Sequence, residues 1–153
     1  MESEIHQLEA DDVCALRQLI LRPHQRVSEC SHPSDRVHDT LHVGATVAGH
    51  LTSIATIARE PLRQDPSGTD WRVHGMATLP EAHGLGLAGR LLDACVEHAR
   101  SRGSRLVWCN ARTPALGFYL RFGFEVRGDE FRLPNIGPHY VMIKDMSDGS
   151  ALG

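Results

Sequence analysis

The sequence lacks the positive charge and the long apolar runs of a nucleic-acid-binding or membrane protein. Its 16 lysines and arginines are outnumbered by 19 aspartates and glutamates, which gives a net charge of −3. No basic field is therefore available to attract nucleic acid or an anionic membrane surface. The apolar runs fall far short of a membrane span, and the acidic start MESEIHQLEADD does not resemble a signal peptide. We expect neither nucleic acid nor a membrane as a partner.

Cysteine pairs and metal-binding motifs are also missing. The four cysteines are widely spaced and form no CxxC pair: Cys14, Cys30, Cys95 and Cys109. This pattern favours free thiols and a cytoplasmic location over a disulfide scaffold. The ten histidines are scattered, and the closely spaced His38 and His42 lack the glutamate of an HExxH motif. We therefore expect no metal.

What is present fits one globular domain. A chain of 153 residues can bury a single core. The apolar fraction of 41% and the charged fraction of 23% are ordinary for globular proteins. We expect one domain over residues 1–146 and a flexible tail at residues 147–153.

The periodicity of apolar residues predicts an α/β protein with the element order β-α-β-β-β-α-β-α-β-β. The expected strands cover residues 5–8, 40–45, 50–58, 70–79, 105–109, 124–133 and 139–144. The expected helices cover residues 9–21, 85–102 and 113–122. This order predicts a mixed sheet with helices packed on it.

Local signals support the helix ends. Pro23 ends the first helix, and Gly103 and Gly123 end the second and third. Thr113 is the expected N-cap of the third helix, with Pro114 at its first position. Loops are expected at residues 24–39, 59–69 and 134–138. Within the strand at residues 70–79, Gly75 indicates a bulge or a close backbone approach.

A glycine-rich turn, His83 to Gly89, joins a predicted strand to the strongest predicted helix. Glycines leave the backbone open to a phosphate, and the first N–H groups of a helix point outward without intrahelical partners. The helix dipole also favours an anion there. The turn therefore predicts a phosphate site, and a tight turn without a ligand is the alternative.

The dinucleotide fingerprint GxGxxG is formally satisfied by Gly84, Gly86 and Gly89. That motif requires an acidic residue roughly 20 positions later to hold a ribose. This chain has Cys109 and Asn110 there. Too few βα units follow for a doubly wound sheet, and no Lys-Ser or Lys-Thr completes a P-loop. We reject both alternatives.

Two motifs lie at residues 76–88, which read MATLPEAHGLGLA, and at residues 115–124, which read ALGFYLRFGF. Together they resemble the GNAT superfamily of N-acetyltransferases. The first motif resembles the family's apolar strand, proline and Gln/Arg-x-x-Gly-x-Gly/Ala signature, and the second resembles its Ala-x-x-x-Tyr-x-x-x-Gly-Phe segment. The resemblance extends over residues 3–146 and implies a mainly antiparallel central sheet flanked by helices. His83 departs from the family's Arg or Gln, and we expect its backbone N–H to serve the diphosphate instead.

The resemblance implies acetyl-CoA as co-substrate and an amine as acceptor. The pantetheine arm would lie along the strand end and the diphosphate on the turn. The residues expected to bind acetyl-CoA are Met76, Ala77, Thr78, His83, Gly84, Leu85, Gly86, Leu87, Ala88, Gly89, Arg90, Asn110 and Phe118. Arg112 is a further candidate, because its spacing from Ala115 matches the family's asparagine.

The resemblance also suggests the catalytic groups. A strand N–H near Met76 would stabilise the oxyanion, and Tyr119 would protonate the departing thiolate. His74 resembles in position a histidine that arylalkylamine N-acetyltransferases use as a base through water. Glu130, His139 or ordered water are alternative bases. Cys109 as a nucleophile is less favoured than a buried strand thiol.

Two other functions stay open from the sequence. One is a non-catalytic acyl-CoA-binding or regulatory domain, and the other is an acetyltransferase acting on protein N-termini or lysines. In this family the acceptor is selected mainly by the segments that correspond here to residues 16–39 and 131–139, whose composition names no particular amine. A homodimer is also left open.

Overall fold

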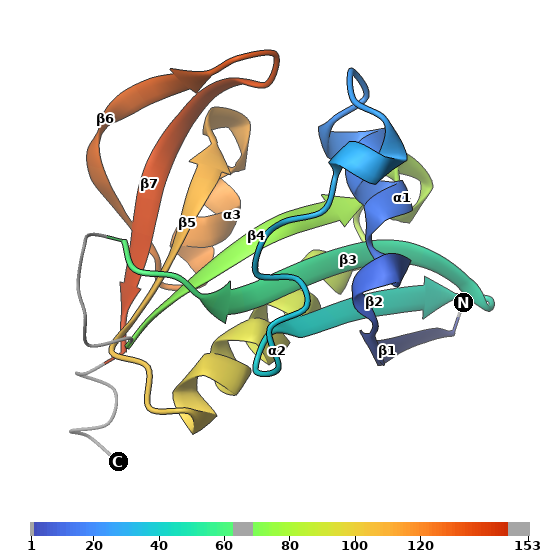
Figure 1. Ribbon diagram of the computed structural model, residues 1–153, viewed down its shortest axis with the longest axis horizontal. Coiled ribbons are helices and arrows are strands. Elements are labelled where there is room, and N and C mark those ends of the chain that lie inside the picture. Colours follow the sequence, from blue (N-terminus) through green and yellow to red (C-terminus); the bar gives the residue numbers. More distant parts are fainter. Residues whose placement is uncertain (1, 63–68, 147–153) are drawn as a thin grey trace. The chain divides into compact units, whose positions relative to one another are not determined.

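The computed structural model describes residues 2–62 and 69–146. Its elements follow the predicted order. The strands are β1 (Ser3–Leu8), β2 (Leu41–Val47), β3 (His50–Arg59), β4 (Asp70–Thr78), β5 (Leu106–Arg112), β6 (Glu125–Leu133) and β7 (Gly137–Asp145). The helices are α1 (Cys14–Leu16), α2 (Leu87–Ser101) and α3 (Leu116–Arg121) (Figure 1).

The strands form one seven-stranded sheet in the order β1-β2-β3-β4-β5-β7-β6. The pairs β1–β2, β2–β3, β5–β7 and β6–β7 are antiparallel. The pair β4–β5 is parallel, as expected for strands connected through a crossover helix. The prediction of a mixed, mainly antiparallel sheet is therefore confirmed.

Two compact units can be recognised along the chain. The first comprises Met1–Ala58 and Val73–His98, and the second comprises Arg59–Arg72 and Ala99–Gly153. The single domain over residues 1–146 stays a prediction. Residues 63–68 of the expected loop and the expected tail at residues 147–153 lie outside the described residues. No helix in the part of the chain that the structure describes has the length and apolar character needed to cross a bilayer.

In the first unit, helical segments cover the sheet. Residues 52–58 of β3 are all buried, and because successive strand residues point to opposite faces, both faces must be covered. Val13 and Leu16 pack against Ile54 of β3 in one apolar cluster. On α2, the apolar stripe is fully buried at Leu91, Leu92 and Cys95.

Hydrogen bonds near both ends of α2 fix its position along the first strands. Arg90 donates to the Ser3 hydroxyl at the start of β1 (3.0 Å). His98 bonds the carbonyl oxygen of Asp39, just before β2 (2.8 Å). Gly103 ends the helix in a left-handed conformation (φ +76°), with the Ser104 N–H bonded to the Ala99 carbonyl. The predicted stop is therefore confirmed.

The first helix differs from the continuous helix expected over residues 9–21. It consists of a 3-10 turn at Ala10–Asp12, the short α1 and a π-helical turn at Arg17–Leu21. In the π turn, Arg22 donates its N–H to the Arg17 carbonyl, five residues back (3.0 Å). Arg17 is buried and bonded outside the helix, as described below, so tertiary contacts replace helical regularity at this point. The stop before Pro23 is as predicted.

In the second unit, β5, β7 and β6 lie side by side, with α3 following β5 (Figure 1). Gly123 (φ +88°) ends α3, as predicted. Thr113 is not the N-cap that we expected, since Arg112 precedes the 3-10 turn Thr113–Ala115. Its hydroxyl instead donates to the Glu130 carboxylate (2.8 Å). A carboxylate is a stronger acceptor partner than a neutral group, which explains the difference.

Candidate active site

The end of β4 carries three of the residues expected to bind the coenzyme: Met76, Ala77 and Thr78. The parallel pairing of β4 with β5 covers only Asp70–Arg72, so the later residues are not paired with β5. On the opposite side, the Thr78 hydroxyl bonds that of Ser53 (2.7 Å), and Leu79 donates its N–H to the Thr52 carbonyl (2.8 Å). A strand held on one side and extending beyond its partner on the other suits the addition of an extended ligand.

The glycine turn has the open backbone that the sequence predicts. Gly84 (φ +84°) and Gly86 (φ +75°) both adopt the left-handed conformation, and no atom lies within 4 Å of the position of a Cβ on either residue. Helix α2 begins directly after them, at Leu87. The N–H groups of its first turn have no intrahelical acceptor. Ala88 and Gly89 lie in that turn. The turn therefore fits a diphosphate.

His83 is bonded differently from our expectation. Its backbone N–H donates to the Pro80 carbonyl (3.2 Å), because the 3-10 turn at Pro80–Ala82 needs that donor. Its ring Nε2 lies 3.1 Å from the Thr78 carbonyl oxygen. A carbonyl can only accept, so Nε2 carries the proton. The ring thus connects the turn to the end of β4, and the amides that begin α2 remain as donors for an anion.

Leu85 is 49% exposed and lines an apolar cavity beside the turn. The cavity has a volume of about 550 Å³, and Leu51 and Leu79 also line it. Arg90, by contrast, directs its guanidinium to Ser3.

His74 of β4 lies beside a second histidine that the sequence analysis did not identify. The ring centroids of His74 and His32 are 4.2 Å apart, with an interplanar angle of 32°. The Nδ1 atom of His32 accepts the N–H of Ser34 (3.3 Å) and bonds its hydroxyl (2.9 Å). Nδ1 is therefore unprotonated, and Nε2 carries the ring proton. No pattern in the sequence connects the loop that contains His32 with β4.

A buried ion pair between Arg17 and Asp35 lies next to Gly75, the residue of β4 that follows His74. The guanidinium of Arg17 donates to both carboxylate oxygens of Asp35 (2.7 and 3.0 Å). It also donates to the Cys30 carbonyl and the Thr56 hydroxyl, each at 3.0 Å. Burial alone would raise the pKa of Asp35, but the hydrogen bonds from Arg17 and from the His32 N–H, together with the Arg17 charge, lower it below its usual value.

Gly75 is in contact with this ion pair. It has a φ of +64°, and a Cβ on it would lie only 2.9 Å from Nε of Arg17. The close backbone approach predicted at Gly75 is thus confirmed, although its partner was not predicted.

His42 closes a ring of hydrogen bonds around Asp35. Its Nε2 lies 2.8 Å from the Asp35 carbonyl oxygen, and its Nδ1 lies 2.7 Å from the Thr56 hydroxyl. Because the carbonyl only accepts, Nε2 carries the proton in the neutral ring, and Thr56 then donates to Nδ1. The Thr56 oxygen accepts from Arg17 at the same time. All four side chains are more than nine-tenths buried.

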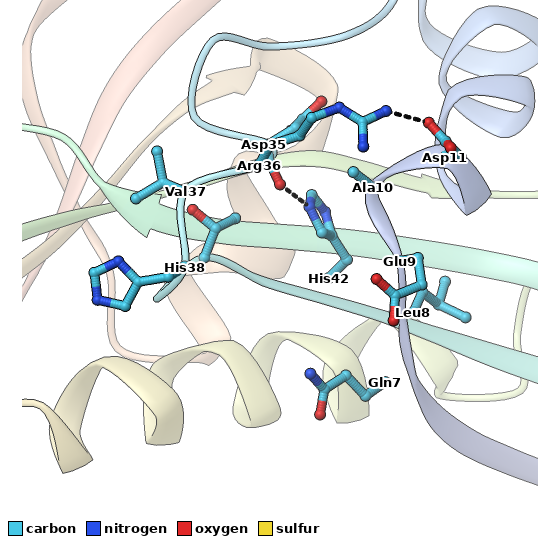
Figure 2. A pocket seen from close by; sticks show the side chains of 11 residues that line it. Gln7, Leu8, Glu9, Ala10, Asp11, Asp35, Arg36, Val37, His38 and His42 are labelled. Atoms are coloured by element: carbon cyan, nitrogen blue, oxygen red, sulfur yellow. Dashed lines mark hydrogen bonds and ion pairs between the residues drawn. The ribbon is translucent and has the colours of Figure 1, made fainter.

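Asp35 also lines a polar cavity with a volume of about 440 Å³. Figure 2 shows the side chains that line this cavity. The segments 7–11 and 35–38, with Thr40 and His42, line it. An exposed ion pair between Arg36 and Asp11 lies across it. None of the site residues expected from the sequence lines this cavity.

In the second unit, Tyr119 lies on α3 and is 8% exposed. Its ring makes edge contacts with Phe118 (5.1 Å) and Phe124 (5.6 Å). Asn110 lies on β5, opposite Val141 of β7. Arg112 ends that strand.

The alternative catalytic groups are bonded within the second unit. Glu130 accepts the Thr113 hydroxyl. His139 is 3% exposed, and its Nδ1 lies 2.8 Å from the Gly137 carbonyl oxygen.

Burial raises the pKa of the Cys109 thiol to about 12, against a smaller opposing effect of the Arg72 charge. That thiol stays protonated at neutral pH, which argues against a nucleophile. Within residues 2–62 and 69–146, no three His, Cys, Asp or Glu side chains are grouped so as to hold a metal.

Known proteins share both the sequence pattern and the fold. The model of the acetyltransferase (GNAT) family matches residues 9–124. A protein described as the uncharacterized N-acetyltransferase YitI of Bacillus subtilis (strain 168) is 36% identical over 146 residues, which cover 94% of this chain and 96% of that protein.

Solved structures agree with this fold. Escherichia coli ElaA superposes with a TM-score of 0.75 at 16% identity, over 94% of this chain and 100% of that one. An aminoglycoside 6'-N-acetyltransferase complexed with coenzyme A superposes with a TM-score of 0.71 at 14% identity, over 93% and 96% of the two chains.

Proposed function

This chain belongs to the acetyltransferase (GNAT) family and is an acyltransferase, and on that premise we propose that it moves an acetyl group from acetyl-CoA directly to an amine, in a ternary complex. The observation that carries the proposal is the open turn at Gly84 and Gly86 directly before α2. Main-chain donors at a helix start bind paired phosphates without any cationic side chain. The coenzyme A complex of a protein with the same fold supports this assignment.

We propose that the coenzyme is held in two places. The amides of residues 84–89 bind the diphosphate, with His83 and Arg90 beside them. The strand end at Met76–Thr78 aligns the pantetheine arm through main-chain hydrogen bonds, and Asn110 and Phe118 complete the contacts. The limited pairing between β4 and β5 supports the second assignment.

The reaction needs an oxyanion donor and two proton transfers. A main-chain N–H at the end of β4 stabilises the negative charge on the thioester oxygen as the amine attacks. His74 accepts, through water, the proton that the amine must lose. Tyr119 donates a proton to the thiolate that leaves. The ring contact between His32 and His74 supports a fixed orientation of the base.

We propose a small-molecule amine as the acceptor. This proposal is supported by the aminoglycoside 6'-N-acetyltransferase that has the same fold, whose name indicates a small-molecule acceptor. The alternative acceptor is the N-terminal amine or a lysine of a protein.

We also expect a cytoplasmic location, supported by the free thiols of Cys14, Cys30, Cys95 and Cys109. A homodimer stays a prediction.

Calorimetry and a thiol-release assay test the proposal. We expect acetyl-CoA and CoA to bind to the purified chain, and acetyl-CoA to release thiol with at least one member of a panel of small amines. Peptides with a free N-terminus or a lysine serve as the alternative acceptors. The proposal fails if neither coenzyme binds at millimolar concentration. Binding without thiol release for any amine would instead indicate the non-catalytic domain.

The base assignment has its own test. The His74→Gln variant removes the proton acceptor, so the acidic limb of the pH–rate profile should move or disappear while acetyl-CoA still binds. An unchanged profile would exclude His74 and favour Glu130, His139 or water.

A further inference from the structure

Two consecutive residues of β4 are contacted by side chains that precede β2 in the sequence. The ring of His74 contacts that of His32, with the ring centroids 4.2 Å apart and the planes tilted by 32°. The backbone at Gly75 packs against the guanidinium of Arg17, whose Nε lies 2.9 Å from the position of a Cβ. Both β4 residues lie directly before Met76, where the proposed oxyanion donor begins.

One carboxylate holds both contacts. Oδ2 of Asp35 accepts from Arg17 Nη1 (2.7 Å) and from the backbone N–H of His32 (2.8 Å). Oδ1 accepts from Arg17 Nη2 (3.0 Å). Asp35 is 6% exposed, and in such an environment charge-assisted hydrogen bonds are strong and directional.

The Arg17 guanidinium has little freedom to move. Its remaining hydrogen bonds go to the Cys30 carbonyl and the Thr56 hydroxyl, and its side chain is 5% exposed. Nε is buried and has no hydrogen-bond partner among the residues that the structure describes. Arg17 therefore meets Gly75 by packing, and it occupies the space that a side chain would need.

We propose that Asp35 is a positioning residue for catalysis. By fixing Arg17 against Gly75 and the turn of His32 against His74, it sets the direction of both the β4 main chain and the candidate base. Buried ion pairs often contribute little net stability compared with apolar side chains. A role in positioning catalytic groups would explain the Arg17–Asp35 pair, because displacements of about 1 Å at a reacting centre reduce rates by roughly 100-fold.

This inference rests on the proposed function, since it concerns the same reaction. The test compares Asp35→Asn with Asp11→Asn, a matched substitution at the exposed carboxylate across the same cavity (83% exposed). For Asp35→Asn we expect kcat to fall by about 10- to 100-fold while the Kd for acetyl-CoA changes by less than about twofold. For Asp11→Asn we expect both values to stay as in the unchanged protein.

The substitution at Asp35 leaves Arg17 buried without its counter-charge, which can unfold the chain. The paired variant Arg17→Met/Asp35→Asn removes both charges together and avoids this problem. We expect it to fold, as judged by circular dichroism and thermal unfolding, and to show the same loss of kcat. A folded paired variant with unchanged kcat would overturn the proposal.

A second readout separates this inference from the proposed function. The ring signals of His74, assigned by their absence in His74→Gln, report its contact with the His32 ring in NMR spectra. We expect them to shift in Asp35→Asn and to remain in place in Asp11→Asn, whether or not the chain acetylates any tested amine. If acetyl-CoA does not bind, the proposed function fails while the shift still supports the role of Asp35. Unmoved His74 signals in Asp35→Asn would overturn that role.

Discussion

Nε of Arg17 lies 2.9 Å from the place where a side chain on Gly75 would begin. Gly75→Ala should therefore be destabilising for two reasons. The left-handed φ of +64° costs roughly 1–2 kcal/mol for a residue with a Cβ, and the Cβ displaces a guanidinium held by four hydrogen bonds. We expect the free energy of unfolding, measured with urea, to fall by at least about 2 kcal/mol. Gly49→Ala is the control for backbone strain alone, because Gly49 has a φ of +82° and no atom lies within 4 Å of the position of its Cβ. Equal losses of unfolding free energy in the two variants would show that the Arg17 side chain moves aside without cost.

Gly86→Ala tests the proposal that the turn before α2 binds the diphosphate of the coenzyme. A Cβ there meets no protein atom within 4 Å, so beyond the strain of the left-handed backbone it should interfere mainly with the ligand. We expect the Kd for acetyl-CoA in calorimetry to rise about tenfold or more. Gly103→Ala has the same open surroundings and nearly the same φ (+76°), but lies at the other end of α2. Gly103→Ala should lose a similar amount of stability while its affinity for acetyl-CoA stays unchanged. If both variants changed the Kd equally, the turn would not be part of the binding site.

Tyr119→Phe removes the proposed acid and retains its ring contacts with Phe118 and Phe124. We expect kcat to fall roughly 100-fold, with the Kd for acetyl-CoA nearly unchanged. The chain has two tyrosines, so Tyr140→Phe is a matched control that should keep its activity. Unchanged turnover in Tyr119→Phe would remove the hydroxyl from the mechanism.

The lowered pKa of Asp35 makes stability depend on pH. Because the pKa is lower in the folded chain than in the unfolded chain, the carboxylate stabilises the fold above the unfolded value of about 3.9. That stabilisation is lost as the pH falls through the folded pKa. At pH 7, Asp35→Asn should reduce the free energy of unfolding by about 3 kcal/mol. The difference should shrink as the pH falls below about 4, and a constant difference would contradict the ion pair.

The buried thiols should be unreactive in the folded protein. Burial raises the pKa of Cys95 and of Cys109 to about 12. The thiolate, which is the reactive form, is therefore rare at pH 8. With a disulfide reagent such as DTNB, we expect only the partly exposed Cys14 to react before denaturant is added. Cys109→Ala should retain catalytic activity, and a loss of activity in a folded Cys109→Ala protein would reopen the nucleophile hypothesis.

The residues themselves determined the element order and the open glycine turn before α2. Apolar periodicity depends on near neighbours, so the strands and α2 could be predicted to within a few residues. Gly84, Gly86 and Gly103 adopt positive φ values, which glycine tolerates without strain. The two GNAT-like motifs are likewise local, and their resemblance was enough to indicate the family.

Tertiary structure decided the contacts between residues far apart in the chain. Arg17 and Asp35 are 18 residues apart, His32 and His74 belong to separate segments, and no periodicity relates them. The π turn of the first helix begins at the buried Arg17, and Thr113 bonds Glu130 instead of capping α3. Local preferences amount to fractions of a kcal/mol per residue, whereas an unpaired buried charge costs several. The long-range pairings therefore prevailed where the two conflicted.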